Sequence, residues 1–427
     1  MKVELAYGDG QLSVDMPDGV TDVIVPAGKP ATRPPAELLA GALTGPVAGP
    51  SLRDLVRPGQ RVAISICDGT RPQPRRLVLA AILEHLSGVV EPADVVVLVA
   101  TGTHRANTQE ELEEMLGADL VRRLRIVSHD ARDPAQLDFV GELGNAVPVW
   151  LNREWTEADV RITTGLVEPH FFAGFSGGPK MVAPGLAGLE TVLVLHDAAH
   201  IAHPLARWGV TDGNPVHEDV CAIAAATDVT FSLDVVMNND HEMVAAFGGE
   251  LFAMHSAACA MVRASAMQAV EAPYDVVVTS NSGYPLDQNL YQAVKGMSAG
   301  AEIVKPGGLI VCASECRDGF PDHGLYRELL FSHESPAELL KSIQTSPTTQ
   351  ADQWQVQIQA QVQAKATVAL YSSYLADDDV RRAHLEPVRD ISALVNRTVA
   401  EAGAGASVCV LPEGPRTVPY LVPEMRH

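Results

Sequence analysis

Short apolar runs alternate with helix-like stretches along most of the chain, and a polar turn follows the end of each run. Four runs in the first half have the length and the β-branched content of buried strands, and they cover residues 61–67, 94–100, 124–128 and 158–164. Helix-like stretches follow at 75–87 and after residue 107, where Thr108 and Glu111 have the spacing of a capping box. This order predicts a mostly parallel sheet, and such sheets bind ligands at the carboxyl ends of their strands.

The second half repeats the pattern on a smaller scale. Apolar runs lie at 229–236, 275–279, 308–313, 366–371 and 408–411, with helix-like stretches at 250–270, 291–295 and 336–342. Residues 1–30 alternate and carry turn signals, which indicates a short antiparallel unit. We therefore predict an α/β protein with a first domain over residues 1–272 and a smaller α/β domain over 273–403. The tail 404–427 is a candidate addition to the first domain.

The alternate glutamines from Gln353 to Gln363 break this pattern. Their period of two cannot form one face of a helix, so we interpret them as solvated and assign them no role.

Composition narrows the class of protein. The 427 residues are 47% hydrophobic and 20% charged, which is typical of a globular protein with a sizeable core. The net charge of −22 argues against nucleic acid and anionic membranes as partners. No signal peptide or apolar run of membrane-spanning length is evident, and the six cysteines are scattered. We expect a cytoplasmic protein with free thiols.

Two of the polar turns carry candidate chemistry. Asp68-Gly69-Thr70-Arg71 places a carboxylate, a hydroxyl and a guanidinium between a strand and a helix, where an anion can be bound. The simpler interpretation is a helix-capping Asp68 with a surface Arg71. His104 follows the next strand, and it is either a proton carrier or an ordinary loop residue.

The loop from Gly165 to His196 holds the remaining candidates of the first half. It is rich in glycine and proline, and a long loop of this kind in a regular chain is usually functional. His170 stands beside two phenylalanines, which suits a proton carrier or a packed core histidine. Lys180 follows Gly178 and Pro179, so the P-loop pattern fails, and a phosphate contact, a covalent attachment point or a solvated lysine remains. His196 is a candidate metal ligand.

The whole set of motifs resembles the lactate racemase family, the nickel-pincer nucleotide enzymes. The matching segments are Asp68-Gly69-Thr70-Arg71-Pro72, Ala100-Thr101-Gly102-Thr103-His104-Arg105, His170 to Gly178 with Lys180, His196, Gly283 to Asn289, Tyr291 to Met297, and Asp352-Gln353-Trp354. They run over nearly the whole chain in the family's order.

The resemblance implies two α/β domains with an active site in the cleft between them. It implies a nickel-bearing pyridinium mononucleotide, the nickel-pincer nucleotide, joined covalently to Lys180 as a thioamide, with His196 completing the nickel coordination. Cofactor-making enzymes are then implied partners. His104 and His170 are the implied acid/base catalysts. Arg71 and Lys295 are implied to bind the substrate carboxylate. Contact with the cofactor is implied for Asp68, Gly69, Thr70, Gln292, Tyr291 and Trp354.

The implied reaction is racemisation or epimerisation of a 2-hydroxy acid. A hydride moves from C2 of the substrate to the cofactor while a histidine takes the hydroxyl proton, which gives a 2-keto acid. When the hydride returns to the opposite face of this acid, the configuration at C2 is inverted. Gly69, Thr103 and Pro179 depart from the best-known racemases, so the substrate could be an acid larger than lactate. Two other classes remain open: a metal-dependent hydrolase that uses His196, His200 and His203 with Glu168, and a cofactor carrier without turnover.

Overall fold

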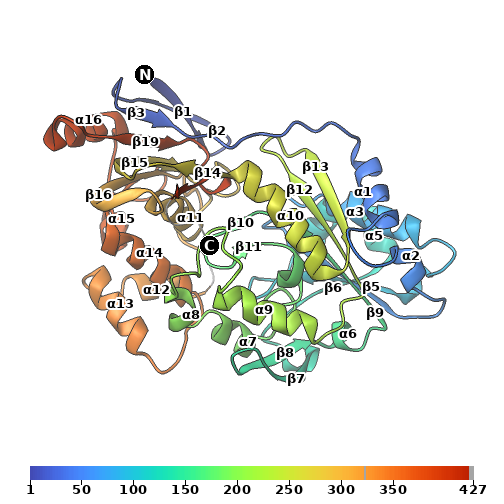
Figure 1. Cartoon of the computed structure of the whole chain (residues 1–427). Helices are drawn as coiled ribbons and strands as arrows, with labels where there is room; N and C mark the ends of the chain where they lie inside the picture. Colours follow the sequence, from blue (N-terminus) through green and yellow to red (C-terminus); the bar gives the residue numbers. More distant parts are fainter. Residues whose placement is uncertain (322–323, 423–427) are drawn as a thin grey trace. The chain divides into compact units, whose positions relative to one another are not determined.

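The structure is a computed structural model that describes residues 1–321 and 324–422 (Figure 1). The chain forms two compact units. We call residues 28–196 and 203–264 the central unit, because they hold the middle of the sequence. Residues 1–27, 197–202, 265–321 and 324–422 form the terminal unit.

This division differs from the predicted domains at both chain ends, since residues 1–27 and 404–422 belong to the terminal unit. The first segment belongs there because a strand after the N-terminal hairpin pairs with a strand near the C-terminus, Thr21 with Val408. Turn signals near residue 20 indicate where a strand starts, but they do not indicate its partner.

The central unit is built on a sheet with strand order β13-β12-β9-β4-β5-β6. Neighbours pair in parallel, except for the antiparallel pair of β12 and β13, so the predicted mostly parallel sheet is confirmed. The strands are β4 (Val62–Cys67), β5 (Val95–Ala100), β6 (Arg125–Ser128), β9 (Val160–Leu166), β12 (Phe231–Met237) and β13 (Met243–Gly249).

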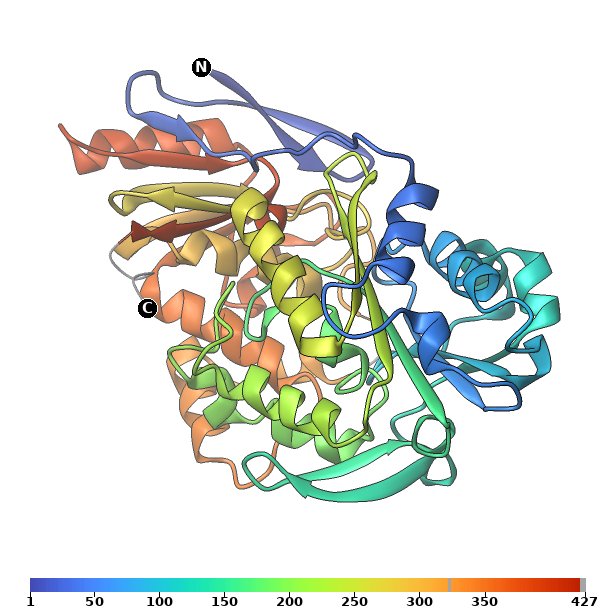
Figure 2. The same ribbon diagram turned by 45° about the vertical axis from the view of Figure 1, so that its right-hand side comes forward.

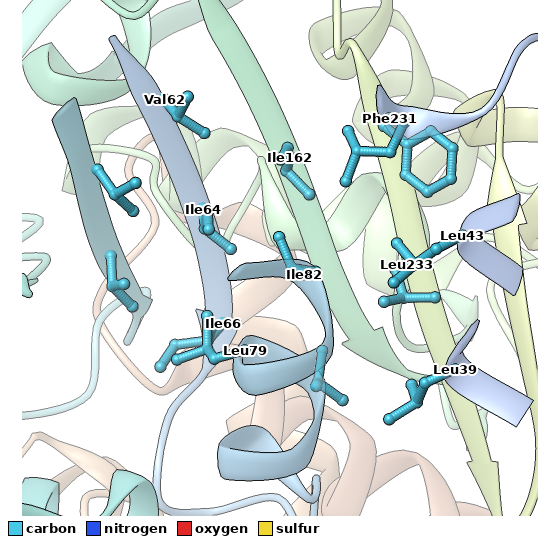
Figure 3. Close-up of a cluster of buried hydrophobic side chains, with 14 of the residues drawn as sticks. Leu39, Leu43, Val62, Ile64, Ile66, Leu79, Ile82, Ile162, Phe231 and Leu233 are labelled. Carbon is cyan, nitrogen blue, oxygen red and sulfur yellow. The ribbon is translucent and has the colours of Figure 1, made fainter. Parts of the chain in front are cut away.

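The core of this unit lies between the sheet and the helices on it. Figure 3 shows Ile64 and Ile66 of β4, Ile162 of β9 and Leu233 of β12, all fully buried. Helices α1 (Pro35–Thr44) and α3 (Arg75–His85) supply facing leucines and isoleucines to the same cluster. Full burial of one such side chain stabilises the fold by ~1.5–3 kcal/mol. Every residue of β4 is buried, which explains the continuous apolar run in its sequence.

The other elements of this part of the chain are mostly short. They are α2 (Leu52–Leu55), α4 (Gln109–Leu116), α5 (Ala118–Arg123), α6 (Arg153–Thr156), α7 (Leu189–Leu195), α9 (Pro215–Ala225), α10 (Leu251–Ala266), and the strands β7 (Leu137–Leu143), β8 (Val147–Asn152), β10 (Pro169–His170) and β11 (Gly174–Phe175). Thr108 and Glu111 form the predicted capping box of α4. The hairpin β7–β8, teal in Figure 2, was not predicted.

The terminal unit has a second sheet, with strand order β18-β17-β16-β15-β19-β3 and parallel pairing throughout. Its strands are β3 (Thr21–Val23), β15 (Tyr274–Ser280), β16 (Val304–Ala313), β17 (Thr367–Tyr371), β18 (Glu386–Pro387) and β19 (Val408–Leu411). The predicted N-terminal hairpin is present as β1 (Lys2–Tyr7) and β2 (Gly10–Asp15), and β14 (Met267–Val270) pairs with β20 (Val418–Leu421).

Helices of the terminal unit include the one expected around residues 291–295. They are α8 (Ala198–Ala202), α11 (Leu290–Ala301), α12 (Tyr326–Leu330), α13 (Pro336–Thr345), α14 (Gln353–Lys365), α15 (Asp377–Arg382) and α16 (Ile391–Ala402). Within residues 1–321 and 324–422, no helix is long and apolar enough to cross a membrane.

The glutamine-rich segment corrects one prediction. It forms α14, and Gln353, Gln355, Gln357 and Gln359 are buried rather than solvated. Their amides satisfy backbone carbonyls of neighbouring segments: Gln357 donates to Ala198 at 2.9 Å, and Gln359 donates to Ala383 at 2.8 Å. A helix that is buried on several sides needs no single apolar face, so a period of two in its sequence does not indicate exposure.

Candidate active site

The turn after β4 is held by its own side chains. Asp68 is buried, and its Oδ1 accepts hydrogen bonds from the N–H and the hydroxyl of Thr70, at 3.2 and 2.6 Å. Arg75, the first residue of α3, is also buried, and its guanidinium donates to the carbonyls of Cys67, Asp68 and Arg71. A buried guanidinium with several carbonyl partners fixes the path of this turn.

The other oxygen of Asp68 binds His104. Nδ1 of His104 lies 2.8 Å from Oδ2 of Asp68, and the imidazole is 40% exposed. Burial alone would raise the pKa of Asp68, but the charge and hydrogen bond of His104, with Thr70 and Arg71, lower it to about 2. The carboxylate therefore stays ionised and holds the proton of His104 on Nδ1, so Nε2 is the ring nitrogen that can take up a proton.

Gly69 and Arg71 complete this turn. Arg71 is partly buried, and its guanidinium lies 3.3 Å from the Thr70 hydroxyl. A Cβ at Gly69 would lie 3.0 Å from Nδ2 of Asn107 and 3.7 Å from Sδ of Met115. The space next to Gly69 is thus bordered by these two side chains, and a bulkier residue there would displace Asn107.

His170 lies in the glycine-rich loop, in the short strand β10. It is 8% exposed, and its Nδ1 accepts from the N–H of Ala173 at 3.3 Å. Because a backbone N–H can only donate, the proton of the neutral ring lies on Nε2. The ring centroids of Phe171 and Phe172 lie 5.0 and 4.5 Å from the centroid of the imidazole. The imidazole therefore has apolar neighbours, as the sequence indicates.

Phe172 brings three candidate residues together. Besides His170, its ring meets His196 edge-on at 5.1 Å between centroids, and Nζ of Lys180 lies 5.6 Å from its centroid. Phe172 is 4% exposed. One buried aromatic ring therefore groups His170, Lys180 and His196, which are far apart in the loop sequence.

His196 has the hydrogen bonding of a metal-binding histidine. It follows the last residue of α7, and its Nδ1 donates to the carbonyl of Val192 at 2.8 Å. Histidine ligands commonly donate one ring N–H to a carbonyl, which holds the lone pair of the other nitrogen toward the metal. Nε2 of His196 is therefore the ring nitrogen that could bind a metal ion.

The loop is also tied to the strand ends. The N–H of Gly102, two residues before His104, donates to the carbonyl of Gly185 at 3.0 Å. The hydroxyl of Ser65 on β4 donates to the carbonyl of Met181 at 2.8 Å. Within the central unit, the turns after β4 and β5 thus lie against the loop that carries Lys180, as expected for the carboxyl end of a parallel sheet.

The candidates of the terminal unit gather at the start of α11. Asn289 caps this helix, and Nζ of Lys295 donates to Oε1 of Gln292, which confirms that their spacing places them on one face. Nε1 of Trp354 donates to the hydroxyl of Tyr291 at 3.1 Å. The side chains of Tyr291, Gln292, Lys295 and Trp354 therefore share one region of the terminal unit.

The histidine cluster of the hydrolase alternative is not arranged as a metal site. The ring of His200 is bound by Asp197 at 2.9 Å, and His203 is exposed. Over the described part of the chain, no group of three or more His, Cys, Asp or Glu side chains could hold a metal ion. The alternative therefore lacks the ligand set that a hydrolytic metal needs.

Sequence reasoning missed Phe172 and Arg75 as parts of the site. Phe172 had a signal, since it lies two residues from His170 in the glycine-rich loop, but aromatic residues usually belong to the core. Arg75 had none, because a charged residue at a helix start is normally expected at the surface.

Family models match both halves of the chain. The lactate racemase N-terminal domain matches residues 7–209, and the lactate racemase C-terminal domain matches residues 269–418. The lactate racemase of Thermoanaerobacterium thermosaccharolyticum is 34% identical over 418 residues, 96% of this chain and 97% of that one. The lactate racemase of Lactiplantibacillus plantarum is 34% identical over 381 residues, 88% of this chain and 89% of that one.

Solved structures agree with these matches. The lactate racemase apoprotein of T. thermosaccharolyticum superposes with a TM-score of 0.92 at 32% identity, covering 98% of this chain and all of that one. A Thermotoga maritima protein shares the fold, with a TM-score of 0.65 at 20% identity over 91% of this chain and 97% of that one. The chain therefore belongs to the lactate racemase family of isomerases.

Proposed function

We propose that this protein racemises or epimerises a 2-hydroxy acid with a nickel-pincer nucleotide attached to Lys180. The observation that carries the proposal is the grouping of Lys180, His170 and His196 around Phe172, next to turns that hold Arg71 and His104. Lys180 provides the amine for the thioamide bond, and His196 provides a nickel ligand through Nε2. When bound, the cofactor supplies a reversible hydride acceptor for C2 of the substrate.

The side chains of the central unit provide the proton chemistry. His104, held by Asp68, takes the hydroxyl proton on Nε2 as the alcohol becomes a carbonyl. His170 in its protonated form returns a proton to the oxygen when the opposite face is reduced, and the ring becomes neutral. In the reverse direction the two histidines exchange these roles, which racemisation requires.

Arg71 and Lys295 are the proposed carboxylate ligands. A guanidinium can bind a carboxylate through two parallel hydrogen bonds, which fixes the substrate while C2 changes its geometry. Gln292 accepts from Lys295 and directs its ammonium group. Tyr291, Trp354, Gly69 and Thr70 are proposed cofactor contacts.

Lactate is the substrate of the named relatives, and it is one candidate here. Position 69 is a glycine where the best-known racemases carry a bulkier residue, so longer or hydroxylated acids are candidates as well. The protein would receive its cofactor from cofactor-making enzymes, and we propose that it acts in the cytoplasm.

Intact-mass and metal analysis after co-expression with the cofactor-making enzymes tests the proposal. The chain should gain the mass of the nucleotide at Lys180 and bind nickel, and it should racemise at least one acid in a panel of chiral 2-hydroxy acids. Lys180→Ala should abolish the adduct. Lys305→Ala, which removes a lysine paired with Asp275, should leave it intact. An unmodified wild-type chain under these conditions would contradict the proposal.

A further inference from the structure

Two buried side chains that the proposed reaction does not use lie under the loop that carries Lys180. Asp234 is on β12 and is fully buried, and His255 is on α10 and is 4% exposed. Both elements belong to the yellow part of the chain in Figure 1. A buried carboxyl group is costly to a fold unless its hydrogen bonds compensate, so its contacts indicate what it does.

The carboxyl group of Asp234 contacts the loop backbone directly. Its Oδ2 accepts from the N–H of Gly178 at 2.6 Å. A Cβ at Gly177 would lie 2.6 Å from Oδ2, and one at Gly165 would lie 2.7 Å from Oδ1. The carboxyl group is thus enclosed by glycine backbone. Burial raises the pKa of Asp234 to about 7, so the carboxyl group is about half protonated at neutral pH.

His255 holds the same stretch of the loop from α10. Its Nε2 donates to the carbonyl of Ser176 at 3.0 Å. A Cβ at Gly178 would lie 2.5 Å from the imidazole, so the loop backbone lies directly against the ring. Burial lowers the pKa of His255 to about 4, which keeps the ring neutral.

These contacts fix the start of the turn that ends in Lys180. Gly177 and Gly178 have φ values of +74° and +50°, a region that favours glycine. A 3-10 turn covers Gly178–Met181, and the N–H of Lys180 donates to the carbonyl of Gly177 at 3.1 Å. The direction in which this turn leaves Gly178 therefore determines where the amine of Lys180 lies.

We propose that Asp234 and His255 are positioning residues that lock the backbone of residues 176–178 and so present Lys180 to the cofactor. This inference rests on the proposed role of Lys180 as the attachment point. The acceptor oxygen of Asp234 and the donor nitrogen of His255 are the required groups.

Variants that keep or remove these groups test the proposal. Asp234→Asn keeps a neutral acceptor of the same size, and Asp234→Ala removes it. His255→Gln keeps an N–H donor, and His255→Ala removes it. Ser232→Ala is the matched control, because Ser232 is buried on the same strand and loses a 2.7 Å hydrogen bond to Thr163 without a contact to the loop.

Two measurements are made on each variant. The first is the fraction of chains with the Lys180 adduct after co-expression with the cofactor-making enzymes. The second is amide hydrogen exchange of a peptide covering residues 174–182 in protein made without them. The alanine variants should lose most of the adduct, and their loop amides should exchange about tenfold to a hundredfold faster, as loss of a buried hydrogen bond predicts. The Asn, Gln and control variants should stay within about twofold of wild type in both measurements, because their loop contacts are kept.

The inference is overturned if Asp234→Ala keeps wild-type adduct and exchange, or if Ser232→Ala loses as much adduct as Asp234→Ala. Asp234→Asn behaving like Asp234→Ala would also overturn it, because the neutral acceptor would then not be the required group. A wild-type chain without adduct would refute the role of Lys180, and loop exchange would still decide whether Asp234 and His255 hold the backbone.

Discussion

Replacing Asp68 with asparagine removes the charge that holds His104 and leaves the size of the side chain unchanged. The carboxylate of Asp68 is 2.8 Å from Nδ1 of His104 and 2.6 Å from the hydroxyl of Thr70. An asparagine can still accept from Thr70. Its neutral amide stabilises a protonated His104 less than the carboxylate does and fixes the orientation of the imidazole less well. We therefore expect Asp68→Asn to lower kcat of the cofactor-loaded enzyme by about tenfold to a hundredfold or more.

The size of the effect on stability follows from the lowered pKa of Asp68. One pKa unit corresponds to about 1.4 kcal/mol, so a change from 3.8 in the unfolded chain to about 2 in the folded protein corresponds to about 2 kcal/mol. Because the folded-state pKa is the lower one, this stabilisation is present above pH 3.8 and is lost as pH falls toward 2. The asparagine variant cannot show this loss.

Urea unfolding of wild type and Asp68→Asn between pH 7 and the lowest pH at which both fold measures the difference. The free-energy advantage of wild type should be constant near neutral pH and shrink as pH falls below about 4. Asp119→Asn is the control, since its carboxylate forms an exposed ion pair with Arg76 at 3.1 Å and should contribute at most ~1 kcal/mol. A difference between wild type and Asp68→Asn that does not change with pH would refute the reasoning.

Three further predictions concern other parts of the molecule. His196→Ala should keep the adduct on Lys180 but lose most of the nickel, measured by intact mass and metal analysis, and full nickel content would contradict the assigned ligand. Gln359→Leu should lower the free energy of unfolding by ~1–3 kcal/mol, because the buried polar groups that form hydrogen bonds with the Gln359 amide lose their partner. An unchanged urea midpoint would argue against a stabilising role of this amide. Gly178→Ala should destabilise the fold by ~1–3 kcal/mol in the same assay, because φ at position 178 is +50° and the new Cβ would lie 2.5 Å from His255. Wild-type stability of this variant would show that the loop can shift at little cost.

Local sequence signals identified the regular elements well. The apolar runs of β4 and β5 are continuous because both faces of the sheet are covered, and the capping box at Thr108 is a contact within one turn of helix. Such features depend on neighbours a few residues away, so the sequence contains what is needed to predict them. The β7–β8 hairpin was missed although Gly144 and Asn145 stand at its turn and Val147, Val149 and Leu151 alternate as buried residues in its second strand.

Long-range pairing set the limits of prediction. The attachment of β3 to β19 joins residues near the two ends of the chain, and nothing near Thr21 specifies that partner. The glutamines of α14 were misread for a related reason. Their amides are satisfied by carbonyls of segments distant in sequence, such as Ala198 and Ala383, so burial became favourable only in the folded protein.

The candidate site divides in the same way. The sequence by itself determined which residues can do chemistry, because His104, His170, Lys180 and His196 stand in motifs that resemble one family over the whole chain. Only the tertiary structure decided how they are held: Asp68 binds His104, Phe172 groups three loop side chains, and Asp234 contacts the loop from β12. The physical reason is that side-chain identity is local, whereas hydrogen-bond partners and burial depend on segments that the fold brings together.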